Sequence, residues 1–283
     1  MKWIETGVIA AACMGICVAA QAQTPNHQGL RYEAQRVPSS GAPVARTEAK
    51  DVSNPAPVAE DPCVKMVQEI GPAAVPTRVR TIVIDPGHGG ENEGAIGVAR
   101  IHEKYLTLKI ALLLADRLRE LLPDVEIVLT RQRDESLSLK ERIEVANRLK
   151  ADLFLSLHFN NSMNPEAIGF ESFWAGDFWE ADMLKAGVEI TDEMREARKK
   201  TGEASERMAY CFNRAMRHRF DVLDRGVKTG DYTVLTRAQV PAVVLEMAFL
   251  SHAQEGLSAV KPEYQARLVQ ALSVAVMNYV LGQ

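Results

Sequence analysis

Short apolar runs alternate with amphipathic stretches along the chain from Val79 onward. The short runs predict strands, because they are mostly apolar and bounded by turn residues. These strands are Thr81–Asp85, Glu126–Leu129, Leu153–His158, Phe170–Trp174, Tyr232–Leu235 and Ala242–Glu246. Apolar residues at helical spacing predict helices at Leu106–Leu122, from a Ser138 cap to about Lys150, at Glu203–Phe220 and at Glu263–Leu281. Strands alternating with helices predict an α/β fold, a three-layer single domain with a mainly parallel twisted sheet flanked by helices.

The first 78 residues lack this pattern and divide into two parts. Residues 1–22 combine a short apolar stretch with the small-residue site Ala20-Gln21-Ala22, which predicts a cleaved signal peptide rather than a buried N-terminal helix. Residues 23–78 hold eight of the 13 prolines and a single aromatic residue, Tyr32, which predicts a disordered tether. We therefore expect an exported protein, periplasmic or extracellular, with its folded domain at residues 79–283.

Composition and charge narrow the class of protein. The 33 basic and 37 acidic side chains give a formal net charge of −4. This charge argues against nucleic-acid binding, because a protein binds the phosphate backbone through a surface rich in basic side chains. No apolar run is long enough to span a bilayer, so we expect no integral membrane segment in the mature protein. Signal cleavage would leave Cys63 and Cys211, which form neither a metal-binding spacing nor a disulfide framework.

Polar side chains gather where three predicted strands end. His88 follows the first strand, His158 ends the Leu153 strand, and Glu246 ends the Ala242 strand. Because the carboxyl ends of parallel strands meet at one edge of a sheet, we expect these side chains to lie close together. Two histidines and a carboxylate, with water in the fourth position, are a ligand set of catalytic zinc. A further carboxylate outside the coordination sphere would then act as the base on the zinc-bound water.

The segment before the Leu106 helix supplies the additional acid that this site needs. We assign Glu103 to the metal and Glu246 to the base, while His102 competes with Glu103 for the metal position. Adjacent side chains diverge, so only one of this pair should face the site. A structural role is the plainer alternative for each histidine. Glu246 favours the functional interpretation of the site, because it ends an apolar run, where a carboxylate is costly to bury without a partner. Asn160 is a candidate substrate contact.

The remaining polar residues near these motifs are interpreted as structural. The glycines around His88 match neither a P-loop nor a dinucleotide fingerprint, and we expect them to let the chain turn and present the imidazole. Four further side chains could hold loops together by ion pairs: Arg131, Asp134, Arg142 and Asn147. Three histidines receive no functional assignment: His27, His218 and His252.

Eight motifs follow one another in a fixed order along Thr81–Leu281. They are Ile84-Asp-Pro-Gly-His-Gly-Gly90, Glu103-Lys104, Leu129-Thr-Arg131 with Asp134, Leu139-Lys-Glu-Arg142, Ala146-Asn147, Ala151–Asn160, Asp224-Arg-Gly-Val227 and Pro241–Ser251. Each motif alone is a weak signal, and their order makes the set specific. As a set, they resemble the zinc-dependent N-acetylmuramoyl-L-alanine amidases of bacterial cell-wall turnover, the amidase-3 family.

The resemblance implies a site and a reaction. It implies one Zn2+ per chain, held by His88, Glu103 and His158, with Glu246 as the catalytic glutamate. The substrate would be peptidoglycan, and the zinc amidase domain at 79–283 would hydrolyse the amide between N-acetylmuramic acid and L-alanine of the stem peptide, in cell-wall turnover or cell separation. Two alternatives stay open, a zinc peptidase that cuts within the stem peptide and a catalytically silent wall-binding module.

The sequence also departs from the family pattern. Asn92-Glu93 stands where Asp-Pro is usual, and Ala248 replaces a usual glycine, but no ligand is lost. Residues Ala175–Gly202 are longer than the minimal core needs. Because some periplasmic relatives block their zinc with an inserted helix until a partner displaces it, we expect this segment to regulate or shape the groove, with a possible protein activator. A solvated surface helix is the plainer alternative.

Overall fold

The computed structural model describes residues 78–282, so the predicted signal peptide and nearly all of the predicted tether lie outside the described residues. Within them a single six-stranded sheet has the order β2-β1-β3-β6-β4-β5. The strands are β1 (Thr81–Pro86), β2 (Glu126–Leu129), β3 (Leu153–Asn160), β4 (Phe170–Trp174), β5 (Asp224–Thr229) and β6 (Ala242–Phe249). Neighbouring strands are parallel except β4 and β6, which are antiparallel. The predicted mainly parallel sheet is therefore confirmed.

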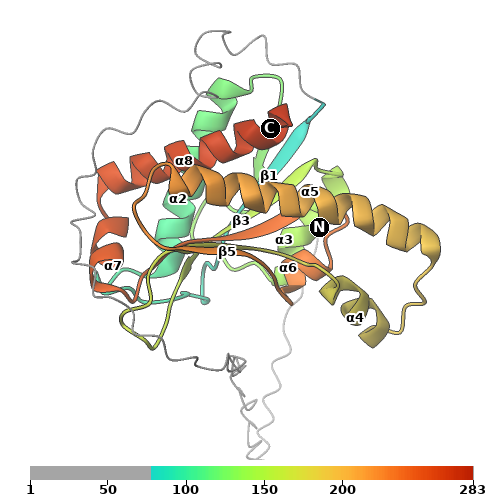
Figure 1. Ribbon diagram of the computed structural model, residues 1–283, viewed down its shortest axis with the longest axis horizontal. Coiled ribbons are helices and arrows are strands. Elements are labelled where there is room, and N and C mark those ends of the chain that lie inside the picture. Colours follow the sequence, from blue (N-terminus) through green and yellow to red (C-terminus); the bar gives the residue numbers. More distant parts are fainter. Residues whose placement is uncertain (1–77, 283) are drawn as a thin grey trace, which may run out of the picture. The chain divides into compact units, whose positions relative to one another are not determined.

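Helices cover both faces of the sheet and make three layers (Figure 1). One face packs against α2 (Glu103–Leu121), α5 (Asp192–Arg217) and α8 (Pro262–Leu281). The other packs against α3 (Leu139–Leu149), α4 (Phe178–Lys185) and α6 (Thr233–Thr236), while α7 (Ala253–Ala259) follows β6. No helix between residues 78 and 282 is both long enough and apolar enough to cross a bilayer.

The pleat of the strands sorts side chains between the two cores. On β1, Ile82 and Ile84 lie in the core with α2, α5 and α8, whereas Val83 lies in the core with α3 and α6. On β3, Leu155 likewise faces the first core and Phe154 the second. Because side chains alternate with a period of two, His158 shares the face of Phe154. The polar strand ends therefore emerge on the side of α3 and α6.

Most predicted elements are confirmed, and one is wrong. The strands Glu126–Leu129 and Phe170–Trp174 agree with β2 and β4, and Ser138 caps α3 through a capping box with Glu141. The predicted strand at 232–235 is the short helix α6, in which the N–H groups of Leu235 and Thr236 donate to the carbonyl of Tyr232. A four-residue apolar run does not distinguish a strand from one helical turn.

Candidate metal centre

The loop after β1 brings its histidine against the end of β3. His88 has a positive φ of 60°, and the backbone N–H of Gly87 donates to the carbonyl of Leu157. A Cβ at Gly87 would lie 2.3 Å from Cε1 of His158, so only glycine leaves room for that imidazole. The predicted role of the glycines, to turn the chain and present His88, agrees with this geometry.

Three side chains from β1, α2 and β3 meet at the carboxyl edge of the sheet. Their candidate ligand atoms all lie within 4.8 Å of one another. Nε2 of His88 lies 3.0 Å from Oε2 of Glu103, and Nδ1 of His158 lies 3.0 Å from Oε1. The two imidazole rings are nearly perpendicular, at 79°, with centroids 4.8 Å apart. The structure thus brings together the three predicted ligands.

Glu103 is a buried carboxylate held in its ionised form. Its two oxygens accept N–H groups of Phe159 and Ala95, at 2.9 and 3.0 Å. Burial alone would raise its pKa, but the hydrogen bonds from His158 and His88 outweigh burial and hold that pKa well below its ordinary value. For His88, burial acts in the opposite direction and lowers the pKa, because the charged form of an imidazole is the protonated one. The hydrogen bond to Glu103 outweighs burial, so the pKa of His88 is raised overall. Two imidazole nitrogens around one ionised oxygen donor are a set that suits a divalent zinc ion.

Neighbouring residues orient the first histidine. Nδ1 of His88 lies 2.8 Å from Oδ1 of Asn92, an acceptor that holds a proton on Nδ1 and leaves Nε2, the atom that faces Glu103, as the one that would bind a metal. Such an outer partner fixes the tautomer of a metal-binding histidine. Asn92, one of the departures from the family pattern, therefore keeps an acceptor at this position. His102 turns away, and its Nδ1 lies 3.3 Å from Oε2 of Glu93, so the structure favours Glu103 over its neighbour.

Glu246 lies beside the three candidate ligands, on the strand next to β3. It is paired in register with His158 across β3 and β6, so both side chains leave the same face. Its Oε2 atom is buried and has no hydrogen-bond partner among residues 78–282. Burial, followed by the charges of Glu103 and Glu171, raises the pKa of Glu246 well above its ordinary value. A carboxyl with high proton affinity beside a candidate metal site is suited to proton transfer.

Buried arginines brace the loop that carries the first histidine. Nη1 of Arg142 lies 2.8 Å from Oδ1 of Asp85, and its Nη2 donates to the carbonyl of His88. Arg131 donates to the carbonyls of Pro86 and Gly87. The structural interpretation of both arginines is confirmed. The remaining predicted loop contacts are Asp134 with Lys104 Nζ at 2.8 Å, and Asn147 with the carbonyl of Arg237 at 3.1 Å.

A charged cluster that the sequence pattern did not predict lies next to Glu246. Glu171 on β4 pairs in register with Glu246, and its carboxylate accepts hydrogen bonds from Asn160, Arg225 and Lys228. Asn160, the predicted substrate contact, thus directs its amide nitrogen to Glu171, and substrate binding by it stays a prediction. The motif Asp224-Arg-Gly-Val227 contains one residue of this cluster, Arg225. The strand to which the motif belongs, β5, was not predicted from the sequence.

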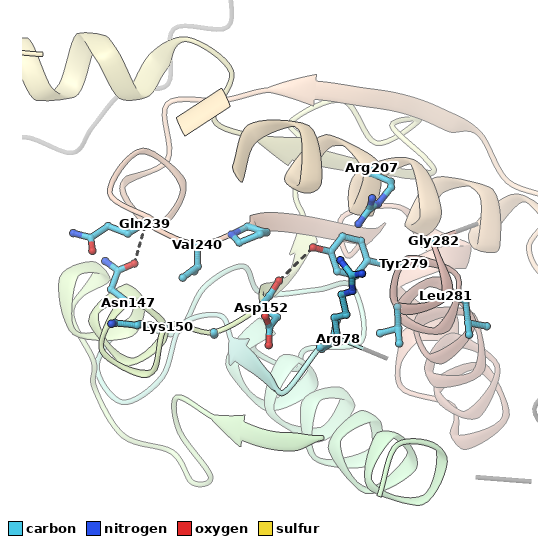
Figure 2. Close-up of a pocket in the computed structure, with 14 residues that line it drawn as sticks. Arg78, Asn147, Lys150, Asp152, Arg207, Gln239, Val240, Tyr279, Leu281 and Gly282 are labelled. Carbon is cyan, nitrogen blue, oxygen red and sulfur yellow. Dashed lines mark hydrogen bonds between the residues drawn. The ribbon is translucent and has the colours of Figure 1, made fainter. Parts of the chain in front are cut away.

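The opposite edge of the sheet contains a different kind of polar site. A cavity of about 810 Å³ is lined there by Lys150, Asp152, Arg207 and Tyr279, among others (Figure 2). Two of its charged groups have partners: Oδ2 of Asp152 accepts two backbone N–H groups, and the guanidinium of Arg207 lies over the ring of Tyr279, at 4.7 Å. This cavity brings no histidines or unpaired carboxylates together, so it lacks the features of the metal centre.

The segment Ala175–Gly202 also belongs to that opposite edge. It forms α4 and the first part of α5, as the predicted helical content requires. Asp182 contacts Arg237, and Arg198 donates to the carbonyls of Leu235 and Ala238, which precede β6. Figure 1 shows α4 and α7 at opposite ends of the domain. The expectation that this segment shapes the groove at the metal centre is therefore wrong for this structure, because antiparallel β4 carries the chain away from it.

Comparisons with known proteins agree on one family. The family model described as N-acetylmuramoyl-L-alanine amidase matches residues 82–278. The germination-specific N-acetylmuramoyl-L-alanine amidase of Bacillus subtilis is 26% identical over 222 residues, which are 74% of this chain and 83% of that protein. The catalytic domain of the amidase CwlV from Bacillus (Paenibacillus) polymyxa has 29% identity and a TM-score of 0.55, covering 71% of this chain and 97% of that one. An N-acetylmuramoyl-L-alanine amidase from Clostridium difficile 630 has 28% identity and a TM-score of 0.60, covering 72% and 97%.

Proposed function

Because the chain belongs to the N-acetylmuramoyl-L-alanine amidase family, we propose that His88, Glu103 and His158 hold one zinc ion and that Glu246 moves the proton of the reaction. The family hydrolyses the amide between N-acetylmuramic acid and L-alanine in peptidoglycan. The observation that carries the residue assignment is the meeting of two imidazoles and a buried carboxylate, beside Oε2 of Glu246, which has no hydrogen-bond partner among residues 78–282.

Zinc, when bound, would polarise the substrate carbonyl and make a water molecule acidic enough to attack at neutral pH. The chain's own residues supply the remaining requirements. Asn92 keeps the His88 imidazole in the tautomer that offers Nε2, and the N–H groups of Phe159 and Ala95 hold the Glu103 carboxylate in place. Glu246 is placed to accept a proton from water and to donate it to the leaving amine of L-alanine.

The raised pKa of Glu246 suits both halves of this transfer. In the absence of a cation, burial and the charge of Glu103 favour its protonated form. A divalent cation beside Glu103 would offset that charge and favour the ionised form, which is the state that accepts a proton. The alternatives of a peptidase and of a silent wall-binding module gain no separate support from any side chain at this edge.

Product analysis tests this proposal. Purified peptidoglycan is incubated with the full chain, with Glu246→Gln and with a buffer control, and the released peptides are identified by mass and by N-terminal labelling. We expect intact stem peptides with a free L-alanine amine from the unaltered protein. Loss of proton transfer should slow Glu246→Gln roughly 100- to 10,000-fold. Cleavage within the stem by the unaltered protein, or full activity of Glu246→Gln, would contradict the proposal.

We also propose that the protein acts outside the cytoplasm, in the periplasm or beyond the cell, because its substrate is there and because residues 1–22 match a signal peptide. Cleavage after Ala22 would start the mature chain at Gln23, and N-terminal sequencing of the exported protein would test this. An activator that works by displacing Ala175–Gly202 from the metal centre is not part of the proposal, because this segment contacts the opposite edge of the sheet.

A further inference from the structure

We propose that Arg225 and Lys228 form a subsite for a carboxylate of the stem peptide, next to Glu246. The inference rests on the proposed metal centre and names the group of the substrate that the neighbouring surface recognises. Stem peptides carry free carboxylates a short distance from the amide that these enzymes cut. A cationic group beside the proposed base would therefore meet an anionic part of the substrate.

A row of paired residues links the metal centre to this subsite. His158 on β3 pairs with Glu246 on β6, and Glu246 pairs with Glu171 on β4. Residues directly opposite each other on neighbouring strands place their side chains on the same face, with Cβ atoms about 5 Å apart. The row therefore runs across the sheet from a proposed ligand, through the proposed base, to Glu171. The next strand in this direction is β5.

A bulge in β5 brings two cations to the end of the row. Phe170 pairs with Asp224 and Ser172 pairs with Val227, so Arg225 and Gly226 together stand opposite the single residue Glu171. Gly226 has a φ of 89°, the left-handed conformation that favours glycine at a bulge. An extra residue reverses the alternation of the side chains that follow it.

The bulge explains why residues 225 and 228 reach the same carboxylate. Residues three apart on a regular strand point to opposite faces. Here Nε of Arg225 lies 3.3 Å from Oε2 of Glu171, and Nζ of Lys228 donates to that same oxygen. The guanidinium of Arg225 also lies over the ring of Phe249, with Cζ 5.0 Å from the centroid. Aromatic stacking of this kind holds the planar fork in a fixed orientation.

The two cations Arg225 and Lys228 share one buried carboxylate, Glu171, as their ion-pair partner. Glu171 is buried and offsets one of the two cations, and its other oxygen accepts from the amide of Asn160. Glu255 also acts on Arg225 electrostatically, but its buried oxygens accept the N–H groups of Gly169 and Phe249.

Both cations also remain accessible to substrate. The side chains of Arg225 and Lys228 are 32% and 40% exposed. The ion pair of Arg225 with Glu171 is made through Nε, so the Nη1–Nη2 end of the guanidinium lies outside that contact. The Nη1–Nη2 end of a guanidinium carries two parallel N–H groups, which match the two oxygens of a carboxylate.

The test compares substrates that differ only in charge. The probes are N-acetylmuramoyl tripeptides with all carboxylates free, with the α-carboxylate of the second stem residue amidated, or with the carboxylates of the third residue amidated. The full chain, Arg225→Met and Lys228→Met are assayed for kcat and KM with each probe. We expect one amidation to raise KM of the unaltered protein by about tenfold, the effect of one charge-assisted hydrogen bond. The amidation that does so identifies the carboxylate.

The variants separate recognition from structure. We expect Arg225→Met to raise KM about tenfold on the free carboxylate and to change turnover of the sensitive amidated probe less than twofold, so that the preference is lost. Arg225→Lys should retain part of the preference. Arg117→Met, on the exposed face of α2 and far in sequence from the cluster, is the matched control.

Three outcomes would overturn the inference. In the first, the unaltered protein shows no preference among the probes. In the second, Arg225→Met and Lys228→Met each lose activity by the same factor on every probe, as expected of purely structural ion pairs. A protein that binds no zinc and releases no L-alanine amine would overturn the proposed function together with the subsite. Zinc content and the midpoint of thermal unfolding, measured for each variant, distinguish these cases.

Discussion

The two edges of the sheet are both polar, but they use their polar groups in opposite ways. At the far edge, a cavity of about 810 Å³ is lined by Asp152 and Arg207 among others, and these two charged groups already have partners (Figure 2). At the carboxyl edge, two imidazoles converge on Glu103, and Glu246 has a buried oxygen with no partner within the described part of the chain. Satisfied groups stabilise a fold, whereas convergent and unsatisfied groups mark a place where a ligand completes the structure.

Removing a proposed zinc ligand should have the largest effect on zinc binding and turnover. Glu103→Gln keeps the shape of the side chain but removes the charge that faces both imidazoles. We expect loss of detectable zinc binding and a fall in turnover of at least about 1,000-fold, because a neutral amide is a poor ligand. Zinc content by mass spectrometry of the native protein measures the first effect. Retention of one zinc per chain would show that Glu103 is not a ligand.

A second variant tests the stability of the same edge. Glu255 is buried and fixes the end of β6 and the start of β4 by accepting the N–H groups of Phe249 and Gly169. Burial, only partly offset by those hydrogen bonds, raises its pKa from 4.5 to about 7. The folded state thus keeps its proton to a higher pH than the unfolded chain. The contribution of protonated Glu255 to the free energy of unfolding is therefore complete below about pH 4.5, and it is lost as the pH rises through 7.

Glu255→Gln should remove that pH dependence. We expect the difference in unfolding free energy between this variant and the unaltered protein to change by on the order of 2–3 kcal/mol between pH 4.5 and pH 7.5. Urea denaturation at the two pH values measures it, with Glu126→Gln on the exposed side of β2 as the control. A constant difference across this range would mean that folding does not raise the pKa of Glu255.

The outer partner of a ligand should have a smaller effect than the ligand itself. Asn92→Ala leaves Nδ1 of His88 without its acceptor at 2.8 Å. Loss of such a partner typically lowers metal affinity or activity about 10- to 100-fold. Competition with a zinc chelator gives the affinity, and Asn92→Asp, which retains an acceptor, should restore most of it. An unchanged affinity in Asn92→Ala would assign Asn92 to the loop alone.

Changes at the far edge should have the smallest effect on activity. Asp182→Ala removes the contact of α4 with Arg237, which is partly exposed. A surface ion pair of this kind contributes about 1 kcal/mol or less, so we expect turnover within twofold of the unaltered protein. Steady-state turnover on purified peptidoglycan measures it. A rise of tenfold or more would show that Ala175–Gly202 inhibits the enzyme from a position that this structure does not contain.

The convergence of the candidate site residues was predictable because they lie at or near the carboxyl ends of strands whose apolar pattern is plain. His88, His158 and Glu246 each follow a buried run, and the rule that parallel strands present their carboxyl ends at one edge places them together. Glu103 required an additional argument, since its neighbour His102 offered the same chemistry. The sequence does not show which of two adjacent side chains turns inward at the start of a helix.

Features that depend on strand direction were not predictable. Strand β5 has the sequence Asp-Arg-Gly-Val-Lys-Thr, whose polar residues and glycine do not form an apolar pattern, so the cluster around Glu171 stayed hidden. The antiparallel direction of β4 also has no signal in its five residues. That direction decides that Ala175–Gly202 leaves the sheet at the far edge, whereas a parallel strand would have delivered it to the metal centre.

We propose that three residues hold the zinc ion and that Glu246 moves the proton. Titrating zinc into the metal-free protein and into metal-free Glu246→Gln tests this separation of roles most directly. Calorimetry gives the number of sites, and the same samples are then assayed on peptidoglycan. We expect one zinc per chain with similar affinity in both proteins, and turnover in the unaltered protein alone. Loss of zinc binding in Glu246→Gln would make Glu246 a ligand, and equal turnover in both would remove it from the reaction.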